Sequence, residues 1–385
     1  MSHGPILLYF GHTPMEGAGS AIIVLRHLQR FAAEGWDVRI VPDWGQDHAL
    51  CHAAGWPVKQ LSHRRPWWPL FNPDRALSRN LRTWLWAGET QTWLGGIQVD
   101  GVLTYLSAFS DTLSLAAVGF ARRYRLPLAT LIHDDTRCFA KNAIEAARAH
   151  RRRQWILEHS TTAWFASPEL AACYDLSPEQ IGVLPPIPEG VLAARGKKTS
   201  AAPDSPLLVY AGNYWPPQLP TLAVIGTATR DAGGRLLAVI KENSAHVTLL
   251  RENGIEWRAP WPRNTDALDY FREHASAVVV SYAPKTEDMP WTRTSFPSKL
   301  IEYCHLGLPI VIVAAEDTAV VRWARARNFP DVFAPSDTAG LGAYVQRLRD
   351  PVFCAERAAL SRFYAEGEFD PVAIQRRLSE SLLRK

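Results

Sequence analysis

Cysteine is scarce in this chain of 385 residues, and the cysteines that occur show no pattern. There are five, an odd number, scattered at Cys51, Cys138, Cys173, Cys304 and Cys354. No Cys-x-x-Cys pair and no Cys/His spacing of a metal site occurs among them. The sequence therefore argues against a disulfide scaffold or a zinc-ribbon protein, and reduced thiols in a cytoplasmic compartment are the simplest account.

Long apolar runs and strong net charge are also absent. No run approaches the roughly 18 residues of a membrane-spanning helix, and residues 1–10 lack the basic and apolar regions of a signal peptide. The formal net charge is only +4, which argues against bulk nucleic-acid binding. We therefore expect a protein that binds no nucleic acid and is cytoplasmic, either free or peripheral at the inner face of the membrane.

What the sequence does contain is a regular alternation of predicted strands and helices. The alternation stops at a proline-rich stretch that begins at Pro185 and ends at Pro206, and then restarts. A chain of this length is also too long for one typical core. This predicts an α/β fold with parallel layers, with a first domain at 1–186, a linker at 187–206 and a second domain at 207–365.

The most informative segment runs from Pro297 to Pro309. Pro297 fits the first turn of a helix and Gly307 fits its C-terminal stop, after which an apolar strand follows. Lys299 and Glu302 are three residues apart and share one helix face, near a helix N-terminus whose free N–H groups favour phosphate. The segment is either a phosphate site or a helix with an ion pair on its solvated face.

The same segment resembles the nucleotide-sugar signature of GT-B glycosyltransferases of the retaining group 1 type. The resemblance lies in the order Pro-Ser-Lys, Glu-Tyr, Gly-x-Pro and a β-branched run. It implies two Rossmann-like domains that face a cleft, and a last helix, within 366–385, that crosses back onto the first domain. It also implies that Glu302 holds the ribose of a nucleotide-sugar donor, with Ser298 and Lys299 in the same donor site.

A glycine-containing loop follows the first predicted strand and opens the first helix. Its glycines let a ligand approach the backbone, and the helix N-terminus favours an anion. The loop resembles the one that GT-B enzymes place against the donor diphosphate and the acceptor, so Gly17 and Gly19 are donor-binding candidates and Glu16 a catalytic one. A plain turn and helix cap is the alternative. Ile22 breaks the Gly-x-Gly-x-x-Gly fingerprint and disfavours an oxidoreductase.

His133 and Asp134 follow another predicted strand, at 128–132. Ligands of open α/β sheets bind beyond the carboxyl ends of the strands, and glycosyl transfer with inversion needs a carboxylate or imidazole base. Retaining GT-B enzymes often carry a His in the matching place, close to the donor sugar. We therefore predict His133 as a catalytic residue with Asp134 as its neighbour and base. A structural, hydrogen-bonded histidine is the alternative.

The second domain departs from the family pattern at two positions. Gly212 and Asn213 follow its first strand where many relatives have an Arg, and Thr294 stands where many retaining members have a Glu. Arg293 and Lys299 are expected to supply the missing positive charge to the diphosphate, because the leaving group must be stabilised. No Asp-x-Asp motif stands out. The prediction is therefore transfer without a metal, and without a cofactor beyond the donor.

Two further donor-site candidates have equally good structural explanations. Lys241 follows a predicted strand and could supply a cation, or it is an exposed loop lysine. Trp257 lies in a segment that resembles the part of relatives that cups the nucleobase, or it is simply a core residue.

Residues 59–86 combine five arginines and four tryptophans with a single acidic residue. Indoles and cations together suit a membrane surface carrying anionic lipid. They would equally suit stacking on a soluble sugar acceptor, and a solvated proline-rich excursion is the third interpretation.

Together these features predict a glycosyltransferase of glycan biosynthesis that moves a sugar from a nucleotide-sugar donor to a glycan, lipid-linked or other acceptor. The departures at Thr294 and after Gly212 keep a second hypothesis open. In that hypothesis the chain is a GT-B-like module that binds a nucleotide or a glycan without catalysis.

Overall fold

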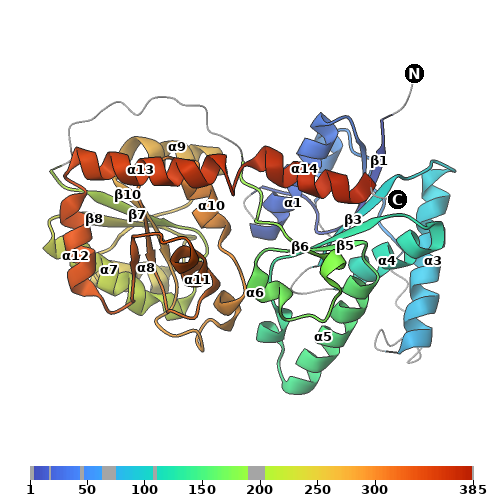
Figure 1. The fold of residues 1–385 in the computed structure, drawn as a ribbon, viewed down its shortest axis with the longest axis horizontal. Helices are drawn as coiled ribbons and strands as arrows, with labels where there is room; N and C mark the ends of the chain where they lie inside the picture. Colours follow the sequence, from blue (N-terminus) through green and yellow to red (C-terminus); the bar gives the residue numbers. More distant parts are fainter. Residues whose placement is uncertain are drawn as a thin grey trace. The chain divides into compact units, whose positions relative to one another are not determined.

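The computed structural model describes residues 4–16, 19–43, 47–62, 75–106, 111–189 and 204–383. The chain divides into two compact units (Figure 1). The first comprises Met1–Ile187 and Val372–Lys385, and the second comprises Pro188–Pro371. The break between Ile187 and Pro188 falls at the start of the segment for which a linker is predicted, and residues 190–203 of that segment lie outside the described residues.

The first unit is a six-stranded parallel sheet with helices on both faces. The strand order is β2-β1-β3-β4-β5-β6, which is the doubly wound pattern that leaves loops at the carboxyl ends of the strands. The strands are β1 Ile6–Gly11, β2 Asp37–Pro42, β3 Gly101–Tyr105, β4 Leu128–Ile132, β5 Thr162–Phe165 and β6 Ile181–Val183. The helices are α1 Gly19–Ala33, α2 Ala49–Ala53, α3 Ala76–Leu94, α4 Thr112–Tyr124, α5 Ala143–Glu158 and α6 Pro168–Ala171, with short 3-10 helices η1 Thr136–Phe139 and η2 Pro178–Gln180.

The second unit repeats this architecture with the order β12-β11-β10-β7-β8-β9, again all parallel. Its strands are β7 Leu207–Ala211, β8 Arg235–Val239, β9 Glu256–Arg258, β10 Ala277–Ser281, β11 Ile310–Val313 and β12 Val332–Phe333. Its helices are α7 Leu219–Asp231, α8 Ser244–Glu252, α9 Asn264–His274, α10 Ser298–Cys304, α11 Ala319–Ala326, α12 Thr338–Arg347 and α13 Pro351–Glu366, with 3-10 helices η3 Pro216–Gln218 and η4 Pro290–Arg293. The predicted α/β class is confirmed.

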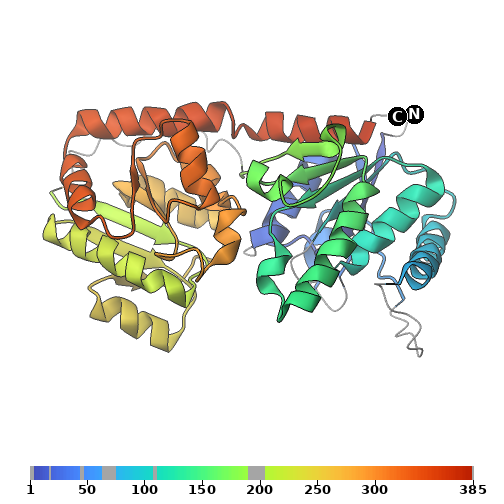
Figure 2. The same ribbon diagram turned by 60° about the horizontal axis from the view of Figure 1, so that its bottom comes forward.

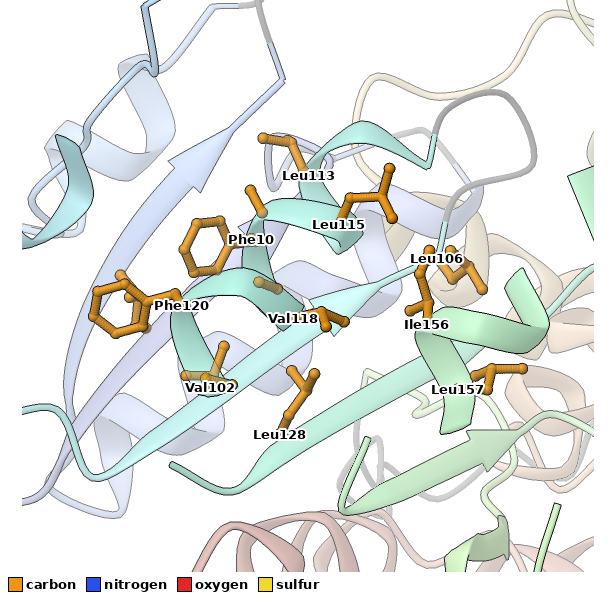
Figure 3. Close-up of a cluster of buried hydrophobic side chains, with 14 of the residues drawn as sticks. Phe10, Val102, Leu106, Leu113, Leu115, Val118, Phe120, Leu128, Ile156 and Leu157 are labelled. Carbon is orange, nitrogen blue, oxygen red and sulfur yellow. The ribbon is translucent and has the colours of Figure 1, made fainter. Parts of the chain in front are cut away.

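The strands form because their apolar residues are covered on both faces, as parallel sheets require. In the first unit one face is covered by α4 and α5 (Figure 3). Phe10 and Leu128 of the sheet pack there with Phe120 and Ile156 of the helices, all of them at most 1% exposed. This packing fixes the carboxyl edge of the sheet, where the candidate residues lie.

The last helix, α14 Pro371–Leu383, packs on the opposite face of the first sheet and lies against that unit in both views (Figures 1 and 2). Ile374 and Leu378 join the core there. The Gln375 side chain hydrogen-bonds to Nδ1 of His27 at 2.8 Å, and the Trp164 indole donates to Ser381 at 3.1 Å. None of the described helices is long and apolar enough to cross a membrane.

Candidate functional site

The most unusual charge of the second unit is the ammonium of Lys299, the second residue of α10. Its side chain crosses directly over Gly212, at the end of β7. A Cβ at Gly212 would lie 2.1 Å from Lys299 Cε and 2.3 Å from Nζ, and the φ of Gly212 is +122°. Only glycine therefore admits this path.

Lys299 is held against an aromatic ring and not against a carboxylate. Nζ lies 4.7 Å from the centroid of the Tyr210 ring. In the part of the chain that the structure describes, the ion pairs include none between Lys299 and a carboxylate, and burial alone shifts its pKa. The residue keeps some exposed surface, but its ammonium lies deep enough that burial lowers its pKa to about 8. At neutral pH this is a positive charge with no counterion among the described residues, and it can bind an anion.

Hydrogen bonds fix the loop that carries Gly212. The hydroxyl of Tyr210 donates to the carbonyl of Asn213 at 3.0 Å and lies 3.2 Å from Oε1 of Gln218. The buried Gln218 donates to the carbonyl of Ser281 at 2.7 Å, which ties the loop to the end of β10. Gly212 and Asn213 themselves stay exposed, so a ligand can reach this backbone.

Two tryptophans stand beside the loop. The rings of Trp215 and Trp291 lie 4.9 Å apart between centroids, and Trp215 is 42% exposed. The backbone N–H of Trp215 donates to Gln218 Oε1 at 2.9 Å, which fixes its position. Aromatic faces of this kind pack against sugar rings and bases, so the pair extends the candidate site beyond the residues that the sequence analysis named.

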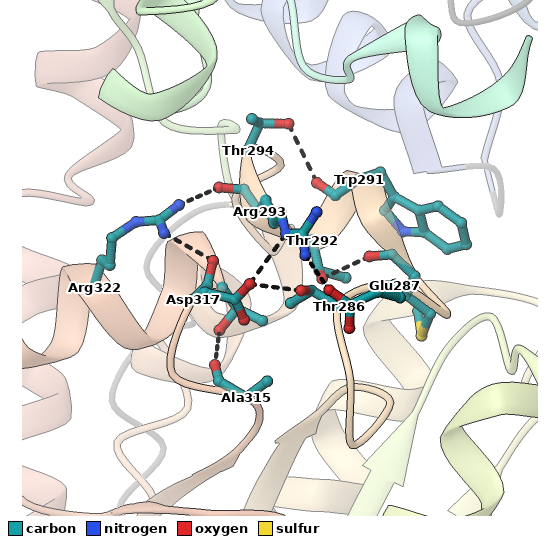
Figure 4. Close-up of polar contacts among 11 residues, drawn as sticks. Thr286, Glu287, Trp291, Thr292, Arg293, Thr294, Ala315, Asp317 and Arg322 are labelled. Carbon is teal, nitrogen blue, oxygen red and sulfur yellow. Dashed lines mark hydrogen bonds and ion pairs between the residues drawn. The ribbon is translucent and has the colours of Figure 1, made fainter.

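Arg293, predicted to share the diphosphate with Lys299, is bound to two carboxylates (Figure 4). Its guanidinium donates to Asp317 at 3.0 Å and to Glu287 at 2.5 Å. Arg322 donates to the backbone carbonyl of Arg293 and, at 2.8 Å, to that of Asp317. The pKa of Asp317 is lowered, although burial acts to raise it, because Thr286 and Arg293 hydrogen-bond to the carboxylate. A diphosphate would have to compete with these acids for Arg293.

The other predicted donor residues occupy less specialised positions. Ser298 opens α10 and Glu302 follows one turn later, both partly exposed. Lys241 is exposed beyond the end of β8. Trp257 lies on β9 and donates its indole N–H to the carbonyl of Ile240 at 3.2 Å, so its polar group is used by the fold.

In the first unit, His133 follows β4 and is buried, at 7% exposure. Burial, and secondarily the nearby His27, lowers its pKa to about 3, so the imidazole is neutral at pH 7. Its ring and that of Tyr105 form a T-shaped pair with centroids 5.2 Å apart. Asp134 is partly exposed, and it raises the pKa of Tyr105, a shift in which burial is the larger cause.

Sequence reasoning missed a second imidazole at the same edge. His12 follows β1, Asp43 follows β2, and His12 Nδ1 lies 2.9 Å from Asp43 Oδ2. The hydroxyl of Tyr9 donates to the carbonyl of His12 at 3.1 Å and fixes its backbone. The His12 ring lies 5.6 Å from that of Tyr105, so Tyr105 contacts both imidazoles. A carboxylate on Nδ1 fixes the ring and leaves Nε2 as a proton acceptor.

One signal could have found this pair. Because β1 and β2 are adjacent and parallel, the residues that follow them meet at one edge, and Gly11 pairs with Pro42 in the register. The sequence pattern of the same loop instead favours Glu16, Gly17 and Gly19. Glu16 is exposed, Gly17 lies outside the described residues, and a Cβ at Gly19 would meet no atom within 4 Å. No clash therefore requires a glycine at position 19.

Comparisons with known proteins give the fold and not a family assignment. No family model and no curated protein matches the chain. Solved structures do match, over almost the whole length. HepE of Anabaena, solved with UDP and glucose, is 12% identical with a TM-score of 0.68, over 98% of this chain and 99% of that one.

Two further solved structures are similar to this chain over almost its whole length. A glycosyltransferase of Rickettsia africae is 11% identical with a TM-score of 0.69, over 98% of this chain and 97% of its own. MurG of Acinetobacter baumannii is 11% identical with a TM-score of 0.59, over 98% of this chain and 99% of its own. The chain therefore has the two-unit α/β fold of the GT-B glycosyltransferases, as the resemblance implied.

Proposed function

We propose that this protein is a glycosyltransferase that moves a hexosyl or related group from a nucleotide-sugar donor to a glycan, lipid-linked or other acceptor. The observation that carries the proposal is Lys299, an uncompensated ammonium held over Gly212 at the carboxyl edge of the second sheet. That edge is where doubly wound sheets bind their ligands. The likeness to HepE, which was solved with UDP and glucose, supports a nucleoside diphosphate sugar as the ligand.

In this proposal Lys299 binds the donor diphosphate. Transfer breaks the bond between the anomeric carbon and the diphosphate oxygen, and negative charge develops on that oxygen. A fixed ammonium in a partly dehydrated site stabilises this charge more in the transition state than in the ground state. Glu302 and Ser298 complete the donor site as ribose and phosphate contacts. The proposal needs no metal and no cofactor, because Lys299 supplies the positive charge.

The acceptor hydroxyl forms the new bond to the anomeric carbon and loses its proton. The first unit offers two imidazoles for that proton, and their environments differ. An imidazole with a pKa of about 3, as in His133, is a weak base. His12 is oriented by Asp43 through Nδ1, which is the arrangement that a general base needs. We therefore assign the proton to Nε2 of His12 and not to the neutral His133.

A thermal-shift screen of nucleoside diphosphates and their sugars tests the proposal. A ligand at a hundredfold excess over its Kd should add about 2.7 kcal/mol to the apparent stability. UDP and UDP-sugars are the first probes, with nicotinamide dinucleotides as the control. A stabilisation by dinucleotides and none by any nucleoside diphosphate would overturn the proposal.

The alternative, a binding module without catalysis, is favoured by Thr294 and Asn213, the two departures from the pattern that the second domain resembles. Donor hydrolysis or transfer separates the two functions. If a nucleotide sugar stabilises the protein but neither hydrolysis nor transfer occurs with any acceptor tested, the binding module is the better description.

A further inference from the structure

Helix α3 carries its large apolar side chains on the outside. Leu77, Leu81, Trp84 and Leu85 are 85%, 47%, 57% and 49% exposed. Their spacing of i, i+4, i+7 and i+8 places them on one face of the helix. Four of the eleven large hydrophobic residues that are most exposed in the described chain therefore form one row on one helix.

The buried face of the same helix is built largely from small and polar residues, Ser78, Thr83, Ala87 and Thr90, together with Trp86 and Leu94. The reason is a close crossing with α4. A Cβ added to Gly119 of α4 would lie 2.5 Å from Cβ of Thr83 and 2.7 Å from its carbonyl oxygen. Larger side chains cannot enter this contact, so the leucines point away from the unit. Figures 1 and 2 show α3 at the margin of the first unit, with α4 on its inner side.

Arginines of α3 and α4 lie on or beside the helix that carries the apolar row. The guanidinium of Arg123, on α4, lies 5.2 Å from the ring of Trp84 and donates to its carbonyl at 3.4 Å. Those of Arg79 and Arg82, on α3, lie over the rings of Trp155 and Trp86 at 4.2 and 4.7 Å. The contacts of Arg82 and Arg123 leave the alkyl stems against apolar surface, whereas Arg79 packs toward α5 and its Nε is buried.

Acidic residues are missing from the same region. No Asp or Glu occurs between residues 75 and 88 or between 112 and 133. Glu89, the one acid of α3, is used by the fold. It accepts from the backbone N–H of Ser62 at 2.8 Å and pairs with Lys59 at 3.2 Å. Arg122 and Arg125 are exposed at the end of α4. Among the described residues of α3 and α4, Glu89 is therefore the one acid, and the other charged side chains are arginines.

We propose that the outer face of α3 docks onto an anionic membrane surface, with Leu77, Leu81, Trp84 and Leu85 among the lipid headgroups and acyl-chain ends. Apolar area together with electrostatic attraction to anionic lipid is what holds an interfacial helix. The inference rests on the proposed function in one respect only, since it makes a lipid-linked acceptor the natural substrate.

Charge decides between a membrane and a second copy of the chain. A symmetric dimer through this face would place the arginine-bordered patch against itself, because a two-fold interface uses the same surface on both subunits. Like charges would then lie opposite each other, which costs free energy. Anionic lipid complements the same cations.

Sedimentation with lipid vesicles tests the proposal on the full chain. We expect binding to vesicles that contain phosphatidylglycerol and weaker binding to pure phosphatidylcholine, with salt weakening the first. The variant Leu81→Ser/Leu85→Ser should bind the anionic vesicles at least about tenfold more weakly. Ile144→Ser and Phe363→Ser, each at a side chain that is 67% exposed elsewhere, are matched controls and should bind like the wild type.

Three outcomes would overturn the proposal: no binding of the wild type to anionic vesicles, equal binding of the variant and the controls, or a dimer in solution that the variant dissolves. The thermal shift with UDP-sugars, measured on the same variant, keeps this test apart from the proposed function. If the variant keeps the thermal shift with UDP-sugars but no longer binds vesicles, the docking surface is supported independently of the reaction that the protein catalyses. If UDP-sugars cause no thermal shift in the wild type, the proposed function is refuted and the membrane proposal is not affected.

Discussion

The first strands of the two units end in the same local structure and then serve different chemistry. In β1 the hydroxyl of Tyr9 reaches the carbonyl of His12, and in β7 that of Tyr210 reaches the carbonyl of Asn213. A glycine lies between each pair, Gly11 or Gly212. In both units the hydroxyl of a buried tyrosine thus holds the loop that follows the first strand, through a hydrogen bond to a backbone carbonyl of that loop.

The difference lies in what approaches that glycine. At Gly212 a Cβ would collide with Lys299, the second residue of α10, whereas at Gly11 it would collide with the Tyr9 hydroxyl. The corresponding helix of the first unit, α4, has the buried Leu113 as its second residue. One edge therefore offers a cation for a diphosphate. The other offers His12, oriented by Asp43, for the proposed proton transfer.

The largest expected effect comes from substitutions at the carboxyl edge of the first sheet. His12→Gln removes the proposed base and should lower the turnover rate by about 10²–10⁴-fold, the range for a positioned acid–base group. Asp43→Asn should give a smaller loss in the same direction, because the imidazole remains but loses its orienting carboxylate. Donor affinity, from the thermal shift, should stay unchanged in both. A larger loss of rate in a folded His133→Ala than in His12→Gln would reverse the assignment.

Lys299→Gln removes the cation at the carboxyl edge of the second sheet. Removing the charge should weaken nucleoside diphosphate binding by about 10- to 100-fold, and a nucleoside without phosphates should bind as before. Titration calorimetry of both ligands measures this. Equal losses for both ligands would contradict the phosphate assignment.

The pH dependence of the same affinity provides a check on the wild type. Only protonated Lys299 attracts a diphosphate, and its pKa is about 8 in the free protein. Affinity should therefore be full below that pH and fall by up to about tenfold per pH unit above it, while Lys299→Gln shows no such fall.

A matched pair of glycine substitutions sharpens the comparison. Gly212→Ala should displace Lys299 and weaken diphosphate binding by about tenfold, because a charged hydrogen bond of about 1.5 kcal/mol is lost. Gly11→Ala presses on a buried tyrosine, so it should cost about 1–3 kcal/mol of stability and leave diphosphate affinity intact. Melting curves with and without UDP measure both quantities. The same phenotype in both variants would show that the two edges do not differ as proposed.

The smallest expected effect concerns acid stability of the first unit. Burial, the larger cause, lowers the pKa of His27 to about 4 and that of His133 to about 3, both from 6.5. The unfolded chain therefore takes up protons first as the pH falls below about 6.5, and stability decreases, by at most about 1.4 kcal/mol per pH unit for each histidine. Between pH 7.5 and 5, His133→Asn should show a shallower fall in Tm than the wild type. Parallel curves would mean that His133 does not stay neutral in the folded protein.

Local sequence patterns are enough to predict the α/β alternation, the first strand of the second domain with Gly212 after it, and the helix that carries Lys299. These depend on local periodicity, proline and glycine, which act over a few residues. The sequence could not decide which charges are already paired. The sequence predicts the same role for Arg293 and Lys299, as cations for the diphosphate. In the fold, Glu287 and Asp317 form ion pairs with Arg293. Lys299 has no such acid among the described residues.

Three further features were decided by the tertiary structure alone. His12 and Asp43 are 31 residues apart and meet because their strands are neighbours in the sheet. Trp257 gives its indole N–H to Ile240 because 256–258 form a strand that the sequence analysis did not predict. The leucines of α3 face outward because Gly119 and Thr83 allow a close helix crossing. In each case the partner is distant in sequence, and its position follows from packing and strand order, which no local pattern encodes.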